Sequence, residues 1–232
     1  MKLQPSQKAW QWSKVTDANK WKIPDGKIMV LEKSLKISKK ESKILDLGCG
    51  IGRHTHYFSQ KGWDIVGFDL SYEGLQKTKQ WLKRDSLETK LIQGQMTKLP
   101  FQKNYFNLII AFNVIYHANK SAIFETIHEI YRVLAPGGYF FGTFLTKKRD
   151  KPFNNSCKQL DDQTIIKYGD EEDGIPHFFT YLKDLLIFLQ DFKILMLDYY
   201  EEYQKPFDFN TIKKQEKSGH YSFLVQKRKK LE

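Results

Sequence analysis

A short glycine-rich segment near residue 50 is the part of the sequence best suited to ligand chemistry. It runs from Asp46 to Gly52, and its glycines stand at alternate positions between a β-rich run and a helical pattern. Glycine at such a turn lets a ligand approach the backbone, because a β-carbon would block the contact. An acid directly before the loop would repel a pyrophosphate but suits a ligand with an ammonium group. The segment therefore predicts a site for a small ligand that carries an amino group.

The spacing excludes two common glycine loops. The dinucleotide fingerprint requires a glycine at the sixth position, and counting from Gly48 that position is Arg53. A phosphate-binding loop requires Gly-Lys-Ser/Thr, which does not follow here. The loop is therefore of another kind.

Alternating strands and helices must position this loop. From residue 43, short β-rich runs alternate with helical patterns. We expect strands at 43–47, 63–68, 89–93, 104–112, 139–145, 192–199 and 221–226. We expect helices at 27–37, 53–61, 71–85, 122–134 and 181–189. This alternation indicates an α/β fold with an open, doubly wound parallel sheet, in which the loop lies at the switch-point crevice where ligands bind.

The pattern also divides the chain into four segments. Residues 1–42 form an expected N-terminal helical cap with three of the five tryptophans, and residues 43–145 form the core. Residues 146–178 form a polar insertion, which we expect to be irregular and to act as a substrate lid. Residues 179–230 would supply the helix and strands that complete the sheet.

The segment from Ile44 to Gly52 resembles the first motif of class I S-adenosylmethionine (SAM)-dependent methyltransferases of the small single-domain type. Five further segments resemble later parts of that family in the right order: 67–71, 94–101, 105–117, 134–138 and 176–180. The match covers roughly residues 40–145, with a recognisable tail to about residue 227. The resemblance implies a three-layer α/β/α fold with a seven-stranded, mostly parallel sheet whose last strand is antiparallel.

The resemblance also implies that SAM is the cofactor and that it contacts Asp46, Gly48, Cys49, Gly50, Gly52, Asp69, Leu70, Gln95, Met96, Phe112 and Asn113. Asp46 would hold the methionine end and Asp69 the ribose hydroxyls. The family often has an acid where Gln95 stands, and the amide oxygen can still accept a hydrogen bond from adenine. These positions also have plain structural alternatives. Asp46 and Asp69 could be ordinary polar residues at strand ends and Cys49 a small buried residue, while Gly52 could serve only helix packing and Met96 only the core.

Histidines are the candidate catalytic residues. An acceptor that must lose a proton during methyl transfer benefits from a nearby base. His117 is the first candidate because the tip of the fourth strand borders the predicted SAM site, and His177 is the second, although each could make only a structural hydrogen bond. His54 is a weaker candidate, and His56 is expected on the surface. The acceptor site could be lined by Asn113, Tyr116, Trp10, Trp12 and Trp21.

Composition limits the partners. The net charge is +11, but only five of the 38 basic residues are arginine, and residues 1–43 alone hold eleven lysines against four acids. A lysine-rich surface therefore explains the charge better than a nucleic-acid groove does. Two cysteines, Cys49 and Cys157, exclude a disulfide framework and a multi-cysteine metal centre, so we expect no metal site. No apolar run reaches the roughly 20 residues of a membrane span, and we expect a cytoplasmic protein with no membrane contact.

Three functions remain open. The first is a methyltransferase that acts on an O or N atom of a small-molecule acceptor. The second is a tRNA or rRNA methyltransferase that uses the basic N-terminal arm, and the third is a non-catalytic SAM-binding module. Two nucleic-acid subclasses are disfavoured, because residues 113–116 read Asn-Val-Ile-Tyr rather than Asn/Asp-Pro-Pro-aromatic and neither cysteine follows a proline. The acceptor and the oligomeric state are not predicted.

Overall fold

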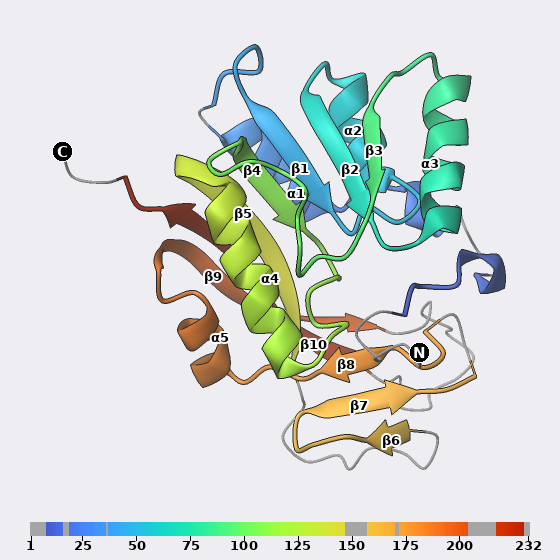
Figure 1. Ribbon diagram of the computed structural model, residues 1–232, viewed down its shortest axis with the longest axis vertical. Coiled ribbons are helices and arrows are strands. Elements are labelled where there is room, and N and C mark those ends of the chain that lie inside the picture. The colour runs from blue at the N-terminus through green and yellow to red at the C-terminus, as the bar shows by residue number, and fades with distance from the viewer. Residues whose placement is uncertain are drawn as a thin grey trace.

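A seven-stranded sheet forms the centre of the protein. The computed structural model describes residues 8–15, 19–35, 37–146, 157–169, 172–203 and 217–229. The strand order is β3-β2-β1-β4-β5-β10-β9 (Figure 1). The strands are β1 (Lys43–Leu47), β2 (Asp64–Asp69), β3 (Lys90–Gln93), β4 (Phe106–Ala111), β5 (Leu134–Thr146), β9 (Phe192–Tyr203) and β10 (Lys217–Lys227). Pairs from β3 to β5 are parallel, whereas β10 is antiparallel to both β5 and β9. The predicted doubly wound sheet with an antiparallel last strand is confirmed.

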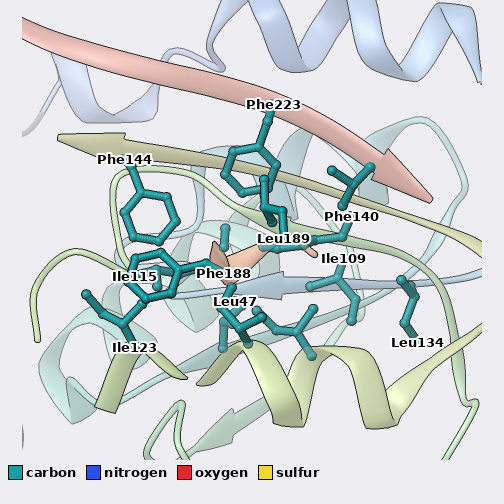
Figure 2. Close-up of a cluster of buried hydrophobic side chains, with 14 of the residues drawn as sticks. Leu47, Ile109, Ile115, Ile123, Leu134, Phe140, Phe144, Phe188, Leu189 and Phe223 are labelled. Carbon is teal, nitrogen blue, oxygen red and sulfur yellow. The ribbon is translucent and has the colours of Figure 1, made fainter. Parts of the chain in front are cut away.

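Helices cover both faces of this sheet. They are α1 (Gly26–Ser34), α2 (Arg53–Gln60), α3 (Tyr72–Arg84), α4 (Lys120–Val133) and α5 (Leu182–Phe188). Successive strand residues point to opposite faces, so Ile44 packs with α1 and α2 while Leu45 packs with α4 and α5. Figure 2 shows the cluster on the face covered by α4 and α5, where Phe188 from α5 lies near Phe144 from β5. The result is the predicted three-layer arrangement.

Side-chain caps fix where three of the helices begin. Asp25 accepts a hydrogen bond from the backbone of Lys27, at the start of α1. Ser71 caps α3 and Asn119 caps α4 in the same way. Such caps satisfy backbone N–H groups that have no partner inside the helix. They set the ends of α3 and α4 that lie next to the carboxyl ends of β2 and β4.

The insertion differs from the prediction. Its described part contains a small antiparallel sheet of β6 (Cys157–Gln159), β7 (Thr164–Lys167) and β8 (Pro176–Phe178) (Figure 1). The expectation of an irregular segment is therefore wrong for residues 157–159 and 164–167. Strands of three or four residues are too short to show a hydrophobic period, and polar turns separate them. Residues 147–156, 170 and 171 lie outside the described part of the chain.

The N-terminal cap is only partly helical. Two short 3₁₀ turns, Trp12–Lys14 and Lys20–Lys22, precede α1. Ile28 and Leu31 of α1 are buried in the cluster beneath the sheet, so α1 belongs to the helical layer that covers the core. No helix in the described ranges is long and apolar enough to cross a membrane.

Candidate active site

The candidate site lies where the strand order reverses. From β1 the chain continues to β2 and β3 on one side, and then returns to β4 and β5 on the other side. In doubly wound sheets this reversal leaves a crevice at the carboxyl ends of the strands. A cavity of about 210 Å³ lies there, bordered by Leu47 at the end of β1, Asp69 at the end of β2 and Phe112 just after β4.

The glycine loop bends tightly against the end of β2. Gly48 and Cys49 both donate backbone hydrogen bonds to the carbonyl of Phe68, at 2.7 and 3.1 Å. Gly48 has φ +73° and Gly50 has φ +56°, in the left-handed region that favours glycine. A β-carbon at Gly48 would collide with the Val114 side chain, and one at Gly50 with the ring of Trp12. Both conformation and space therefore require glycine at these two positions.

Asp69 connects this loop to β2. Its Oδ2 accepts a hydrogen bond from the Gly50 amide and its Oδ1 accepts one from the Ser71 amide, each at 2.7 Å. Burial raises the pKa of this carboxyl, while the backbone donors oppose that effect. Each carboxylate oxygen can accept more than one hydrogen bond, so Asp69 retains acceptor capacity toward the cavity it lines.

Asp46 lies behind the cavity wall. Only 2% of it is exposed, and its Oδ2 accepts a hydrogen bond from Thr55 Oγ1 of α2 at 2.6 Å. Burial raises the pKa of this carboxyl to about 6, against the hydrogen bond from Thr55. Neither Asp46 nor Gly52 lines the cavity, although both were predicted to contact the cofactor. The structure ties Asp46 to α2 and places Gly52 against Thr78 of α3.

The other nine predicted cofactor residues come together around the cavity: Gly48, Cys49, Gly50, Asp69, Leu70, Gln95, Met96, Phe112 and Asn113. The loop after β3 is tied to β2, because Gly94 donates a backbone hydrogen bond to the Asp69 carbonyl at 3.0 Å. Asn113 has φ +57°, and its backbone N–H donates to Thr143 Oγ1 at 2.8 Å. We call these nine residues the strand-end wall.

Three tryptophans of the N-terminal cap close another side of the cavity. The rings of Trp10, Trp12 and Trp21 lie 5.7–6.0 Å from one another. The Arg53 guanidinium lies 5.4 Å from the Trp21 ring and 5.0 Å from the Phe112 ring. The indole nitrogens of all three tryptophans are buried without a hydrogen-bond partner among the described residues. Buried donors of this kind call for an acceptor, which a ligand or water can supply.

One end of the cavity is polar. His117, in the turn after β4, and Glu172, in the insertion, both line it. His117 Nε2 lies 4.0 Å from Glu172 Oε1, and His177 Nε2 lies 2.9 Å from Glu172 Oε2. His177 itself does not line the cavity, and only 1% of it is exposed. We call Trp10, Tyr116, His117, Glu172 and Ile175, which border this end, the insertion wall.

A backbone hydrogen bond brings the two predicted histidines together. Phe178 of β8 donates to the carbonyl of Tyr116 at 2.8 Å, so β8 lies directly beside the turn after β4. The His117 and His177 rings are consequently 4.7 Å apart, edge to face. Glu172 is placed by a turn in which the amide of Ile175 donates to its carbonyl at 2.9 Å.

Charge at this end is set by burial and by the neighbouring cations. Burial lowers the pKa of His117 to about 3, with a further lowering from His177, so the ring is neutral at physiological pH. Burial raises the pKa of Glu172, but the contact with His177 and the charge of Lys167 outweigh it and hold that pKa well below its usual range. The Lys167 ammonium lies 2.7 Å from Glu172 Oε2. The group at the cavity surface is therefore a carboxylate beside a neutral imidazole.

Two other predicted histidines have structural partners. His54 is buried, and its Nε2 accepts a hydrogen bond from the Asp25 amide at 3.3 Å. Burial lowers its pKa well below the usual value, although the residue also borders the cavity. His56 was expected on the surface, and this is wrong: it is buried, stacks on Trp81 at 4.1 Å and lies 2.7 Å from Asp85 Oδ2.

Sequence reasoning missed Glu172 and Arg53 as cavity residues. Glu172 lies in the acidic run 170–173 of the insertion, and a run of acids usually marks a solvated surface. Its one sequence signal was the position of that run in an insertion expected to contribute to the site. Arg53 stands directly after the glycine loop, where no family motif identified it.

The fold is that of Rossmann-like methyltransferases. Residues 44–138 match the family model described as a methyltransferase domain. A solved structure of a SAM-dependent methyltransferase from Methanosarcina mazei superimposes with a TM-score of 0.69 and 17% identity, over 87% of this chain and 98% of that one. The expected class I methyltransferase fold is confirmed.

Two characterised types of methyltransferase are among the similar proteins. A sterol 24-C-methyltransferase from Kluyveromyces lactis is 35% identical over 148 residues, which is 61% of this chain and 38% of the relative. A 1,6-didemethyltoxoflavin-N1-methyltransferase from Burkholderia thailandensis, solved with its substrate and S-adenosylhomocysteine, has a TM-score of 0.60 at 15% identity, over 87% of this chain and 76% of that one. The chain thus spans well under half the length of the sterol methyltransferases it matches.

Proposed function

We propose that this protein is a SAM-dependent methyltransferase that transfers a methyl group to an O or N atom of a small-molecule acceptor. The observation that carries the proposal is the meeting of the Asp69 carboxylate and the glycine loop at the switch point, joined by the hydrogen bond from Gly50. The methyltransferase domain match and the small-molecule methyltransferases among the relatives support it. The scarcity of cysteines, two in the whole sequence, agrees with action in a reducing, cytoplasmic compartment.

The strand-end wall fits SAM chemically. Asp69 offers a carboxylate for two ribose hydroxyls, and Leu70 and Met96 offer apolar surface for an adenine ring. Gln95 can meet the edge of that ring with its amide. The unpartnered indole N–H groups of the cap can donate to a carboxylate, and their rings favour a nearby sulfonium. When bound, SAM would supply an electrophilic methyl group. This group is carried on a sulfonium, whose positive charge disappears on transfer.

Asp46 and Gly52 would act on SAM from behind the wall. Asp46 holds the end of β1 to α2 through Thr55, and Gly52 begins that helix in the left-handed conformation. Both residues therefore support the bend that the cofactor would contact. The direct contact of Asp46 that the sequence predicted would require its other oxygen, Oδ1, or a movement of the side chain, because only 2% of the residue is exposed.

The insertion wall would receive the acceptor. His117 is neutral, so a ring nitrogen can accept a hydrogen bond from an acceptor hydroxyl or amine and orient it. With a pKa of about 3 the ring is a weak base, and Glu172, 4.0 Å away, would favour any positive charge that develops on the acceptor. His177 does not reach the cavity and would act as a positioning residue that holds Glu172. The protein's main contribution is alignment and exclusion of water, because the donor is intrinsically reactive.

The test is methyl transfer from radiolabelled SAM to a panel of metabolites bearing hydroxyl or amine groups. We expect label in at least one metabolite, S-adenosylhomocysteine as co-product, and at least a 100-fold loss in Asp69→Ala. A parallel arm offers tRNA and rRNA over a range of salt concentrations. Label in RNA with a steep salt dependence would instead support the RNA methyltransferase, and binding of SAM without transfer to any acceptor would support a non-catalytic module.

A further inference from the structure

We propose that His117, Glu172 and His177 form a binding site for one divalent transition-metal ion, whose open coordination positions face the cavity and receive chelating oxygen or nitrogen atoms of the acceptor. One nitrogen of each imidazole and one oxygen of the carboxylate lie within 4.8 Å of one another. Two histidines and one carboxylate form a common ligand set for zinc and for non-haem iron, with positions left open for substrate.

The contact between His177 and Glu172 has the geometry of two ligands rather than of a hydrogen bond. Nε2 of His177 and Oε2 of Glu172 are 2.9 Å apart. This buried nitrogen nevertheless has no aligned hydrogen-bond partner among the described residues. Two ligand atoms of one ion, each about 2.1 Å from it, are about 3.0–3.4 Å apart. Each directs its lone pair at the ion and not at the other ligand atom. The observed contact is short and misaligned, as that arrangement requires.

The second ring nitrogen of His177 is held as in many metal sites. Nδ1 lies 3.1 Å from the carbonyl oxygen of Ile175. A carbonyl only accepts, so Nδ1 carries a proton, and in the neutral ring Nε2 presents its lone pair toward Glu172. Lys167 already places one positive charge on Glu172 Oε2, and a metal ion would use the His177 lone pair together with the remaining carboxylate lone pairs. Metal-ligating histidines usually donate their other N–H to a carbonyl in this way.

The remaining two ligands are also held in place. Glu172 receives the Lys167 ammonium on Oε2 at 2.7 Å, and Oε1 faces His117 Nε2 at 4.0 Å. The His117 ring packs against Tyr116 and Trp10, with ring centroids 4.4 and 5.7 Å away. His117 and Glu172 line the cavity, so an ion can reach the site, and a bound acceptor can reach the ion.

The ligand types indicate which ions suit the site. Imidazole nitrogen favours zinc, copper, iron and nickel over magnesium and calcium, which prefer oxygen. The sequence expectation of no metal site rested on the scarcity of cysteines, and this ligand set needs none. The role of the ion rests on the proposed function, since it would replace direct contact of His117 with the acceptor by contact through the metal.

The test measures metal binding alone, with neither SAM nor acceptor present, so it can fail independently of the proposed function. The full chain is treated with a chelator, titrated with Co²⁺ and followed by visible absorption, with Zn²⁺ as competitor. We expect one Co²⁺ per chain, displaced by Zn²⁺ and unaffected by millimolar Mg²⁺. His117→Gln and His177→Gln should each weaken binding at least 100-fold, and Glu172→Gln at least tenfold.

A matched control is the pair of His56 and Asp85, which has a similar short contact of 2.7 Å outside the cavity. His56→Gln should bind Co²⁺ within twofold of the wild type. Thermal melting checks that each variant is folded, and His117→Gln, at the cavity surface, keeps the test valid if the more buried His177 variant unfolds. Absence of saturable Co²⁺ binding below 1 mM in the folded wild type would overturn the proposal, as would binding that survives in folded His117→Gln.

Discussion

The two walls of the cavity are built in different ways. The strand-end wall lies within residues 48–113, and the strands β1 to β4 fix the position of its backbone. The insertion wall joins residues near 10, 117 and 175, which meet through tertiary contacts such as the hydrogen bond from Phe178 of β8 to the turn after β4. A wall made of consecutive strand ends can be predicted from motifs, whereas a wall assembled from distant segments depends on tertiary contacts. If the proposed function is correct, the first wall determines the cofactor and the second determines the acceptor.

The largest expected effect is at Asp69, and it belongs to the strand-end wall alone. Asp69→Ala should weaken binding of S-adenosylhomocysteine at least 100-fold, about 3 kcal/mol, because a charged acceptor of two hydrogen bonds is lost. The measurement is calorimetric titration. His117→Gln on the insertion wall should bind the same compound within about threefold of the wild type. Equal losses in the two variants would contradict the division of the cavity into two walls.

The next effect concerns the loop that shapes the strand-end wall. Gly48→Ala should lower the free energy of unfolding by about 2–3 kcal/mol, because alanine is strained at φ +73° and its β-carbon meets Val114. Gly62→Ala is the matched control: its φ is +76°, but no atom lies within 4 Å of the added carbon. It should lose about 1 kcal/mol in urea unfolding. If Gly62→Ala lost as much, strain alone rather than close packing would explain the loop.

A smaller effect is expected at Asp46, whose carboxyl has a pKa of about 6 in the folded protein against 3.8 ordinarily. The folded state therefore holds this proton more tightly, so the contribution to stability is greatest below pH 3.8 and is lost as the pH rises through 6. Asp46→Asn removes this titration. Between pH 5 and 7.5 the wild type should lose about 1–1.5 kcal/mol relative to the variant in urea unfolding.

The same variant tests the position of Asp46. Because the carboxylate lies behind the strand-end wall, Asp46→Asn should change the affinity for S-adenosylhomocysteine by less than about fivefold. A loss as large as that of Asp69→Ala would favour the direct contact that the sequence predicted.

The smallest effect is expected where the cap meets the insertion. Lys8 Nζ lies 3.3 Å from Asp173 Oδ2, and both side chains are partly exposed. Lys8→Met should lower the free energy of unfolding by less than 1 kcal/mol, because water and salt screen such a pair. The effect of this variant on catalysis should appear in the KM for the acceptor rather than in the KM for SAM. A change confined to the KM for SAM would contradict the assignment of the insertion wall to the acceptor.

The sequence predicted the fold and most of the strand-end wall for physical reasons. Buried runs such as 43–47 and 106–111 are long enough to show as strands, and the conformations of Gly48 and Gly50 leave a direct trace in residue type. The position of Asp46 in the sequence could not reveal its hydrogen bond with Thr55, because that contact depends on how α2 packs against the end of β1. Glu172 could not be distinguished from its acidic neighbours. The strands that flank it in the sequence, β7 and β8, have only three or four residues each and are too short to be recognised from the pattern.

The most direct test of the central claim is a crystal structure of the protein with S-adenosylhomocysteine. We predict that its ribose hydroxyls lie on Asp69 and its adenine beside Leu70 and Met96, with its sulfur directed toward the insertion wall. A structure in which Trp12 still covers Gly50 and the compound is absent, or lies away from Asp69, would contradict the account.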